Sequence, residues 1–302
     1  MTRRGWLLFA AMCVLWGIPY LLIKVAVRDF SPVTVVFLRT GIGAVLLLPV
    51  AIARKELGPV LRAWRWLIPY TLVEVTVPWL LLTVAEERLA SSLVGLLVAA
   101  VPLVGALMLL AIRAEDRLDA RRGLGLVIGF LGVAALLGLG DLRGDALALA
   151  EMAVVVIGYA AGPIIVARKL AHVPATGVIA VSLTATAVVM APFAVGTWPS
   201  HPPGLAAVGA VAGLGVLCTA VAFVIFFALI AEVGPARTQT FIYVNPAVAL
   251  VLGVLLLGEP FGISDVVGFG LILAGLLLAT RRAPEPRREG AVSAQEREEP
   301  GF

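Results

Sequence analysis

Charge is the first thing that this sequence lacks. Charged residues make up 14% of the 302 residues, whereas a soluble globular domain carries roughly 25%. Hydrophobic residues reach 61%, well above the roughly 45–50% that is usual in soluble domains. The shortage of charge excludes an ordinary soluble domain, and the excess of apolar residues indicates an integral membrane protein.

Cysteine and histidine are also scarce, with two residues of each. Cys13 and Cys218 both lie within apolar runs, so they predict neither a disulfide framework nor a metal site. His172 and His201 lie in gaps between apolar runs, and no neighbour of either has the spacing of a metal ligand. We therefore expect no metal.

Several enzyme motifs are missing as well. The sequence contains no His-Glu-x-x-His, no paired aspartates within apolar runs and no glycine-rich phosphate loop with a lysine. A membrane-embedded enzyme is therefore a remote alternative. Transport driven by ATP binding to this chain alone is also excluded, and we expect no cofactor.

Long apolar runs are what the sequence has instead. A helix that crosses a bilayer needs about 20 mainly apolar residues. The first run resembles a secretory signal peptide, but it continues without a cleavage pattern, so we expect an uncleaved helix. The charged segment 283–302 is expected to be a disordered cytoplasmic tail. Ten helices are predicted, at 6–27, 31–52, 65–85, 89–112, 122–140, 145–167, 174–195, 204–231, 235–257 and 262–280.

Basic residues lie in the gaps between these runs and predict the orientation. With the N-terminus inside, most of the 23 lysine and arginine residues fall on the cytoplasmic side. We therefore expect a multi-pass protein of the plasma membrane. Both of its termini are expected on the cytoplasmic side. The net charge of +4 is then an orientation signal, and no nucleic-acid partner is expected.

One motif occurs twice, about half the chain apart. An apolar run separates Pro102 from Glu115, and a similar run separates Pro246 from Glu259. Each half holds five predicted helices, so the second half must enter the membrane from the opposite side. Inverted repeats of this kind are common in secondary transporters, where the substrate site lies near the midplane between the halves.

These elements resemble the EamA-like family of the drug/metabolite transporter superfamily over residues 6–280, as repeats at 6–140 and 145–281. The resemblance implies an all-α integral membrane protein with ten transmembrane helices, in two inverted five-helix repeats around a central cavity. It also implies export of small metabolites, such as amino-acid-like compounds or drugs, without ATP. The first copy departs from the family pattern, because Arg-Ala precedes Glu115 where the family usually has an apolar residue and glycine. The matching residues are Trp16-Gly-Ile-Pro-Tyr20 with Lys24, Pro32 with Arg39, and the two Pro-to-Glu elements.

Ionisable residues within the predicted helices are candidate site residues, because each costs roughly 2.5–3.5 kcal/mol at the bilayer centre. Glu74 is the deepest. It is interpreted as a proton-titrating carboxylate or a counter-charge for a cationic substrate, with a structural pair to Lys24 or Arg39 as the alternative. Lys24 and Arg39 could each bind an anionic substrate group or serve as a snorkelling or structural cation. Glu151 could face the cavity or pair with Arg143.

Helix interruptions at matching positions of the two halves are a second pointer to a site. Pro19 interrupts the first helix beside Trp16 and Tyr20, which lie on one stripe with Lys24. In the sixth helix, Gly158-Tyr159 and Gly162-Pro163 are expected to act in the same way. Trp16, Tyr20 and Tyr159 are therefore candidates for substrate contact, with simple packing as the alternative.

Polar residues before Pro246 distinguish the ninth helix from the apolar fourth. Gln239, Tyr243 and Asn245 could bind substrate or form hydrogen bonds between helices. Glu115 and Glu259 lie at helix ends, where we expect structural caps or ion pairs. Faces of small residues leave a homodimer open beside a monomer.

The sequence therefore predicts a secondary active transporter that exports a small organic metabolite by alternating access, either coupled to protons or as a facilitator. An importer or exchanger of the same architecture is the alternative. The expected partners are a small-molecule substrate and the lipid bilayer.

Overall fold

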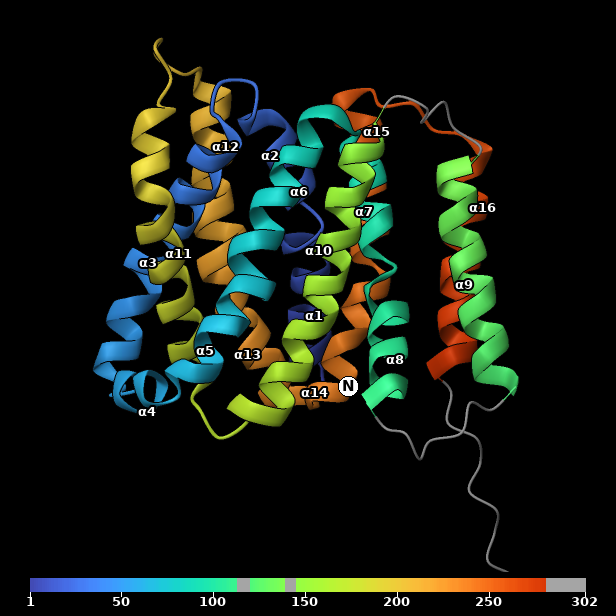
Figure 1. The fold of residues 1–302 in the computed structure, drawn as a ribbon, viewed down its shortest axis with the longest axis horizontal. Helices are drawn as coiled ribbons and strands as arrows, with labels where there is room; N and C mark the ends of the chain where they lie inside the picture. The colour runs from blue at the N-terminus through green and yellow to red at the C-terminus, as the bar shows by residue number, and fades with distance from the viewer. Residues whose placement is uncertain (113–119, 139–144, 281–302) are drawn as a thin grey trace, which may run out of the picture.

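A computed structural model describes residues 1–112, 120–138 and 145–280, and the regular structure within these ranges is entirely helical (Figure 1). Nine helical segments of the described chain are long and apolar enough to cross a membrane, and Ile263–Ala279 is a shorter apolar helix that follows them. The protein is thus a multi-pass membrane protein, and the prediction of an all-α fold with ten spans is confirmed. The segment 283–302 and Glu115 lie outside the described residues.

The ten spans are numbered in chain order, and several consist of more than one helix. Segments η1, η2 and η3 are π-helical, and η4 is a 3₁₀-helix. The spans are α1 (Arg3–Leu15) with α2 (Pro19–Ala26); α3 (Pro32–Ala53); α5 (Trp64–Tyr70), η1 (Thr71–Thr76) and α6 (Val77–Arg88); α7 (Ser91–Val98) with α8 (Val101–Ile112); α9 (Ala120–Gly138); α10 (Ala146–Ile165) with η2 (Val166–Leu170); α11 (Ala175–Gly196); α12 (Leu205–Gly215), η3 (Val216–Val221) and α13 (Ala222–Val233); α14 (Pro235–Thr238), η4 (Gln239–Tyr243) and α15 (Asn245–Leu257); and α16 (Ile263–Thr280). The short helix α4 (Leu57–Arg62) connects spans 2 and 3.

The most extensive helix contacts join spans of different halves. Span 1 packs on span 8, span 2 on span 7, span 3 on span 6, span 4 on span 9 and span 5 on span 10. Exchanging the two halves leaves this set of pairs unchanged, because the pair 1 and 8 becomes the pair 6 and 3. An inverted repeat produces such a pattern, and it places the boundary between the halves through the middle of the bundle.

Two faces of the bundle are used below to describe positions. The N face carries the N-terminus, with Thr2 and Glu232, and lies at the bottom of Figure 1. The far face carries the ends of the spans on the opposite side, with Asp29, Arg88 and Glu259.

Spans 5 and 10 lie side by side at one end of the bundle (Figure 1) and touch backbone to backbone. A Cβ atom on Gly125 would lie 2.6 Å from the carbonyl oxygen of Gly275, and one on Gly132 would lie 2.7 Å from that of Gly268. A Cβ on Gly275 would collide with the backbone of Gly129. The glycines that recur in both halves of the sequence therefore form the contact surface of these two helices, as small residues commonly do in membranes.

Prolines divide spans 4 and 9, which the sequence predicts as continuous helices over 89–112 and 235–257. In span 4, α7 ends at Val98 and α8 begins at Val101. Pro102 has no N–H to continue the hydrogen-bond ladder and disfavours helical geometry in the residue before it. In span 9 a 3₁₀ segment precedes Pro246 for the same reason. The predicted interruption of span 1 before Pro19 is present.

The sequence predicts an interruption of the sixth helix at Gly158-Tyr159 and Gly162-Pro163, and this prediction is wrong. Helix α10 continues to Ile165, and the π-helical segment η2 begins only afterwards. The two glycines allow close approach to span 3 instead. A Cβ on Gly158 would collide with the carbonyl oxygen of Val73, and one on Gly162 would collide with the carboxylate of Glu74.

The contact between spans 5 and 10 can be tested with two matched glycine substitutions in α16. Gly275→Ala places a Cβ against backbone atoms, which cannot move independently, whereas Gly270 faces open space. We expect Gly275→Ala to lower stability by about 1–3 kcal/mol and Gly270→Ala to leave it unchanged or raise it by up to about 1 kcal/mol. Thermal unfolding of the purified variants in detergent measures both. Equal melting temperatures for the two variants would contradict the proposed packing.

Candidate functional site

Two π-helical segments occupy corresponding positions in the two halves. Segment η1 lies within span 3 and η3 lies within span 8, and these spans are equivalent in the repeat. A π-turn widens the helix and often marks a functional position. The two segments flank the boundary between the halves, where an inverted-repeat transporter holds its substrate.

Two hydroxyl pairs hold η1 against span 7. The Thr71 and Ser182 hydroxyl oxygens lie 2.7 Å apart, and so do those of Thr76 and Thr186. The two threonines are five residues apart, whereas their partners in the α-helix α11 are four apart. A π-helix repeats its hydrogen bonds every five residues, so the wider turn lets both pairs form.

Glu74 lies in η1 and faces span 6, where Gly162 makes room for its carboxylate. Its Oε2 atom is buried and has no hydrogen-bond partner among the described residues. Neither Lys24 nor Arg39 forms an ion pair with it in the described structure, so the structural pair that the sequence left open is not found. Tyr70 lies four residues before Glu74, and Tyr159 lies on α10 between the two glycines that approach Val73 and Glu74.

Arg39 is buried in α3 and is held on two sides. Its Nε donates to the hydroxyl of Thr219 at 3.1 Å, and its guanidinium carbon lies 3.7 Å from the centroid of the Trp79 ring. Thr219 belongs to η3 and donates in turn to the carbonyl oxygen of Leu214, five residues earlier, at 2.8 Å. The π-turn thus positions the threonine that positions Arg39. The two terminal amino groups of the guanidinium donate to no residue of the described chain.

Tyr20 and Tyr159 lie in the same interior region. Tyr20 of α2 is buried in the main hydrophobic core, and Tyr159 of α10 packs against it. Tyr159 also packs against a second core cluster, which includes Val75 of η1 and Trp79, the partner of Arg39. Side chains from spans 1, 2 and 6 therefore converge on the region beside η1.

Glu86 completes this region, and the sequence analysis missed it. The residue is 0% exposed, and neither of its carboxylate oxygens has a hydrogen-bond partner among the described residues. The sequence predicts that the third helix ends at residue 85, but α6 continues to Arg88. The sequence did contain a signal for its burial: Glu86 follows Trp79 by seven residues and Leu82 by four, a spacing that puts all three on one face of a helix. We use the name central polar cluster for five residues: Tyr20, Arg39, Glu74, Glu86 and Tyr159.

Lys24 has a structural position. Its ammonium group donates to the carbonyl oxygens of Glu86 at 2.5 Å and of Leu89 at 2.8 Å, at the C-terminal end of α6. A cation is favourable there, because the last carbonyls of a helix carry partial negative charge. The side chain joins span 1 to span 3 and does not snorkel to the surface.

Trp16 lies in an aromatic cluster rather than beside the central polar cluster. Its ring centroid is 5.0 Å from that of Phe241, 5.1 Å from that of Phe226 and 5.6 Å from that of Phe223. Rings at such distances stabilise packing. This position favours the packing interpretation for Trp16.

The three polar candidates of span 9, Gln239, Tyr243 and Asn245, lie in different environments. Asn245 is buried. In the favourable orientation of its amide, the side-chain nitrogen donates to the carbonyl oxygen of Phe241 at 3.1 Å and to that of Cys13 at 3.2 Å. It thereby connects the interrupted regions of spans 1 and 9. Tyr243 is half-buried against the main core. Gln239 lies in η4, and its side chain falls outside what the structure describes.

Glu259 caps the start of span 4 on the far face. Its carboxylate accepts hydrogen bonds from the backbone N–H groups of Ser91 at 2.7 Å and Ser92 at 2.9 Å. Gly258 allows this turn, because its φ of +66° is in the left-handed region. Burial would raise the pKa of Glu259, but the bonds from Ser92 and Ser91 outweigh it and hold the pKa below its ordinary value.

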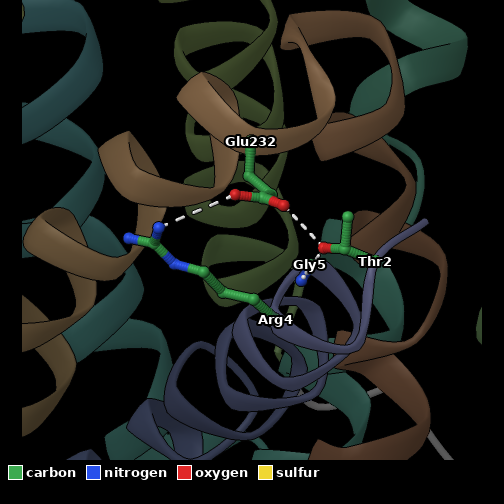
Figure 2. Close-up of polar contacts among 4 residues, drawn as sticks. All are labelled: Thr2, Arg4, Gly5 and Glu232. Atoms are coloured by element: carbon green, nitrogen blue, oxygen red, sulfur yellow. Dashed lines mark hydrogen bonds and ion pairs between the residues drawn. The ribbon is translucent and has the colours of Figure 1, made fainter.

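Ion pairs join the two halves at both faces. On the far face Arg88 contacts Glu151 and Asp145, the latter at 3.4 Å. Arg143, the partner considered for Glu151, lies outside the described residues. On the N face, Figure 2 shows Thr2 donating to Glu232 at 2.5 Å, with Arg4 3.9 Å from the same carboxylate. The first contact connects spans 3 and 6, and the second connects spans 8 and 1.

Metal binding finds no support in the described ranges, where no three His, Cys, Asp or Glu residues are grouped as ligands. The chemistry that the central polar cluster offers is ionic. It combines one guanidinium with free donors, two carboxylates with free oxygens, and two phenols.

Comparison with known proteins decides the family. The model of the EamA-like transporter family matches residues 3–138 and again residues 146–281. The chain belongs to the EamA-like transporter family. As a member of it, the protein is a transporter. The two family matches begin 143 residues apart (146 − 3), close to the 144 residues (246 − 102) between the two Pro-to-Glu motifs.

Relatives in this family come from both archaea and bacteria. An uncharacterized transporter of Archaeoglobus fulgidus is 25% identical over 92% of this chain and 99% of its own length. The uncharacterized inner membrane transporter YedA of Escherichia coli K12 is 26% identical, with 89% of this chain and 88% of the relative covered. A crystal structure covers 93% of this chain and 98% of its own at a TM-score of 0.66 and 19% identity, which shows the same fold.

The cap formed by Glu259 predicts a pH dependence of stability. Because the folded-state pKa is depressed, the stabilisation is full above the ordinary glutamate pKa of about 4.3 and is lost as the pH falls through the folded-state value. Glu259→Gln should therefore lower stability at pH 7 by about 1 kcal/mol, and the difference from wild type should shrink toward pH 3. Melting temperatures in detergent across this range test it. Glu87→Gln, an exposed glutamate on the same face, is the control; a Glu259→Gln deficit that stays constant with pH would contradict the cap.

Proposed function

We propose that this EamA-family protein is a secondary active transporter of the plasma membrane, which exports a small organic metabolite by alternating access with protons as the coupling ion. Both termini lie in the cytoplasm, so the N face is the cytoplasmic face. The observation that carries the proposal is Glu74, a carboxylate with an unpartnered oxygen at the boundary between the two halves.

A buried carboxylate without a partner is unfavourable, because the surrounding protein and lipid cannot replace its hydration. Two events relieve this cost, the binding of a proton and the approach of a cationic or hydrogen-bonding substrate group. If both compete for Glu74, entry of one favours release of the other. That competition couples a proton gradient to substrate movement.

The ion pairs at the two faces support alternating access. Arg88 with Glu151 fastens spans 3 and 6 on the far face, and Glu232 with Arg4 fastens spans 8 and 1 on the N face (Figure 2). These span pairs are equivalent in the inverted repeat. Rocking of one half against the other would therefore loosen one contact while it tightens its counterpart.

Location and direction rest on other observations. The basic residues concentrate on the N face by sequence, which supports cytoplasmic termini. The E. coli relative is named an inner membrane transporter, which supports a plasma-membrane location for this chain.

Proton flux in proteoliposomes tests the proposal. Wild-type protein and Glu74→Gln are reconstituted with a pH-sensitive dye inside and exposed to a panel of amino acids and cationic drugs. We expect a substrate of the wild-type protein to drive proton movement, and Glu74→Gln to reduce that movement to background while substrate binding persists, because the amide cannot take up a proton.

Glu87→Gln serves as the control, since Glu87 is exposed and outside the central polar cluster. Equal proton flux through wild type and Glu74→Gln would make Glu74 structural and remove the coupling mechanism. Substrate movement that persists without proton movement would identify a facilitator.

A further inference from the structure

Exposed cations gather at one place on the N face, where α4 contacts α5 and α5 contacts η2 (Figure 1). They come from the end of span 2, from α4, from the start of span 3 and from the end of span 6. Lys55 has a φ of 57°, in the left-handed region after a helix where glycine is the favoured residue. We call this set of six residues the basic surface: Arg54, Lys55, Arg62, Arg65, Arg168 and Lys169.

Negative charge in the same region points away from the basic surface. Glu56 is the only acidic residue of the segment 54–66, and the segment 166–176 has none. The Oε2 atom of Glu56 is buried, and a Cβ atom on Gly177 of α11 would lie 3.3 Å from it. None of the six cations forms an ion pair with a described residue. Their charge is therefore available to an anion from outside the chain.

Two tryptophans lie among these cations. The Nζ atom of Lys169 lies 4.7 Å from the centroid of the Trp66 ring, and the guanidinium carbon of Arg65 lies 5.7 Å from that of Trp64. The face of an indole ring attracts a cation. Trp66 belongs to span 3 and Lys169 to span 6, so one of these contacts crosses the boundary between the halves.

The apolar side chains beside the cations indicate what kind of anion fits. Trp64 and Trp66 are 54% and 43% exposed, and Leu61 of α4 and Ile68 of α5 are exposed as well. Tryptophan favours the interface between hydrocarbon and water. A soluble anion would use only the cations, whereas a phospholipid offers a phosphate to the cations and acyl chains to the apolar side chains.

We propose that the basic surface binds the headgroup of an anionic phospholipid. Groups of four to eight lysine and arginine residues beside a membrane helix commonly bind such lipids. Arg65 of span 3 and Lys169 of span 6 hold the headgroup from the two halves. The lipid thereby joins, at the N face, the same two spans that Arg88 and Glu151 join at the far face. This site lies outside the central polar cluster and is independent of the proposed coupling.

Native mass spectrometry of the purified full-length chain in detergent tests this inference, because it resolves each bound lipid. The probes are phosphatidylglycerol, phosphatidylcholine with the same acyl chains, and glycerol phosphate as a headgroup without chains. We expect the first phosphatidylglycerol to bind about 10-fold more tightly than phosphatidylcholine. Glycerol phosphate should not displace it.

Four sets of variants assign the contacts. Arg65→Gln and Lys169→Gln should each weaken the first phosphatidylglycerol about fivefold, and the double variant about 25-fold, without changing phosphatidylcholine. Arg65→Lys combined with Lys169→Arg keeps both charges and should retain most of the affinity. Arg121→Gln combined with Arg122→Gln removes two charges at the start of α9 and is the matched control, which should bind as wild type does. Melting temperatures show whether each variant is folded.

Four results would overturn the inference. Equal affinity for the two lipids would remove the role of the headgroup charge. Equal losses in the double variant and in the control would mean a general attraction to the basic N face. A loss in only one of the single variants would place the headgroup on one half alone, and displacement by glycerol phosphate would identify a site for a soluble anion. Proton flux through Glu74 is measured separately, so failure of either proposal leaves the other standing.

Discussion

Hydrocarbon offers no hydrogen bonds, and this constraint explains where the polar side chains of this protein lie. In the described structure most of the side-chain hydrogen bonds between different spans join the two halves. Thr71 pairs with Ser182, Arg39 with Thr219, and Glu259 with the backbone of Ser91. Each such bond contributes only about 0.6 kcal/mol on average within a membrane. A boundary made of many weak bonds can hold one arrangement and still exchange it for another, as the proposed alternating access requires.

The inverted repeat supplies equivalent positions, and the side chains give them different tasks. The π-segments η1 and η3 correspond between the halves, but η1 carries Glu74 whereas η3 carries the threonine that orients Arg39. The wider π-turn also supplies the register for contacts that an α-helix would place on different faces. A negative and a positive group are thereby delivered to one interior region from two related pieces of backbone.

The sequence predicts the spans and the repeat because each depends on local composition or regular spacing. It also singles out Glu74, Arg39, Tyr20 and Tyr159 as candidates, since ionisable and aromatic residues stand out in apolar runs. It fails for Glu86, because a glutamate beside Glu87 and Arg88 resembles a solvated helix end, and only the packing of neighbouring spans shows its burial. It also misplaces the distortion of span 6, because whether a glycine breaks a helix or admits a neighbour depends on what packs against it.

The same packing separates structural ions from candidate site ions. Lys24 and Glu259 lie at helix ends, where backbone carbonyls or N–H groups satisfy them. Glu74 lies in the middle of span 3, where the backbone groups already bond to one another, and its buried Oε2 atom has no partner among the described residues. Glu86 lies in the last turn of α6, and both of its carboxylate oxygens likewise have none. A charge in the first position stabilises the resting fold without any ligand. An unpartnered charge in the second position raises the free energy of the empty protein, and in the proposed mechanism a proton or a substrate lowers it again.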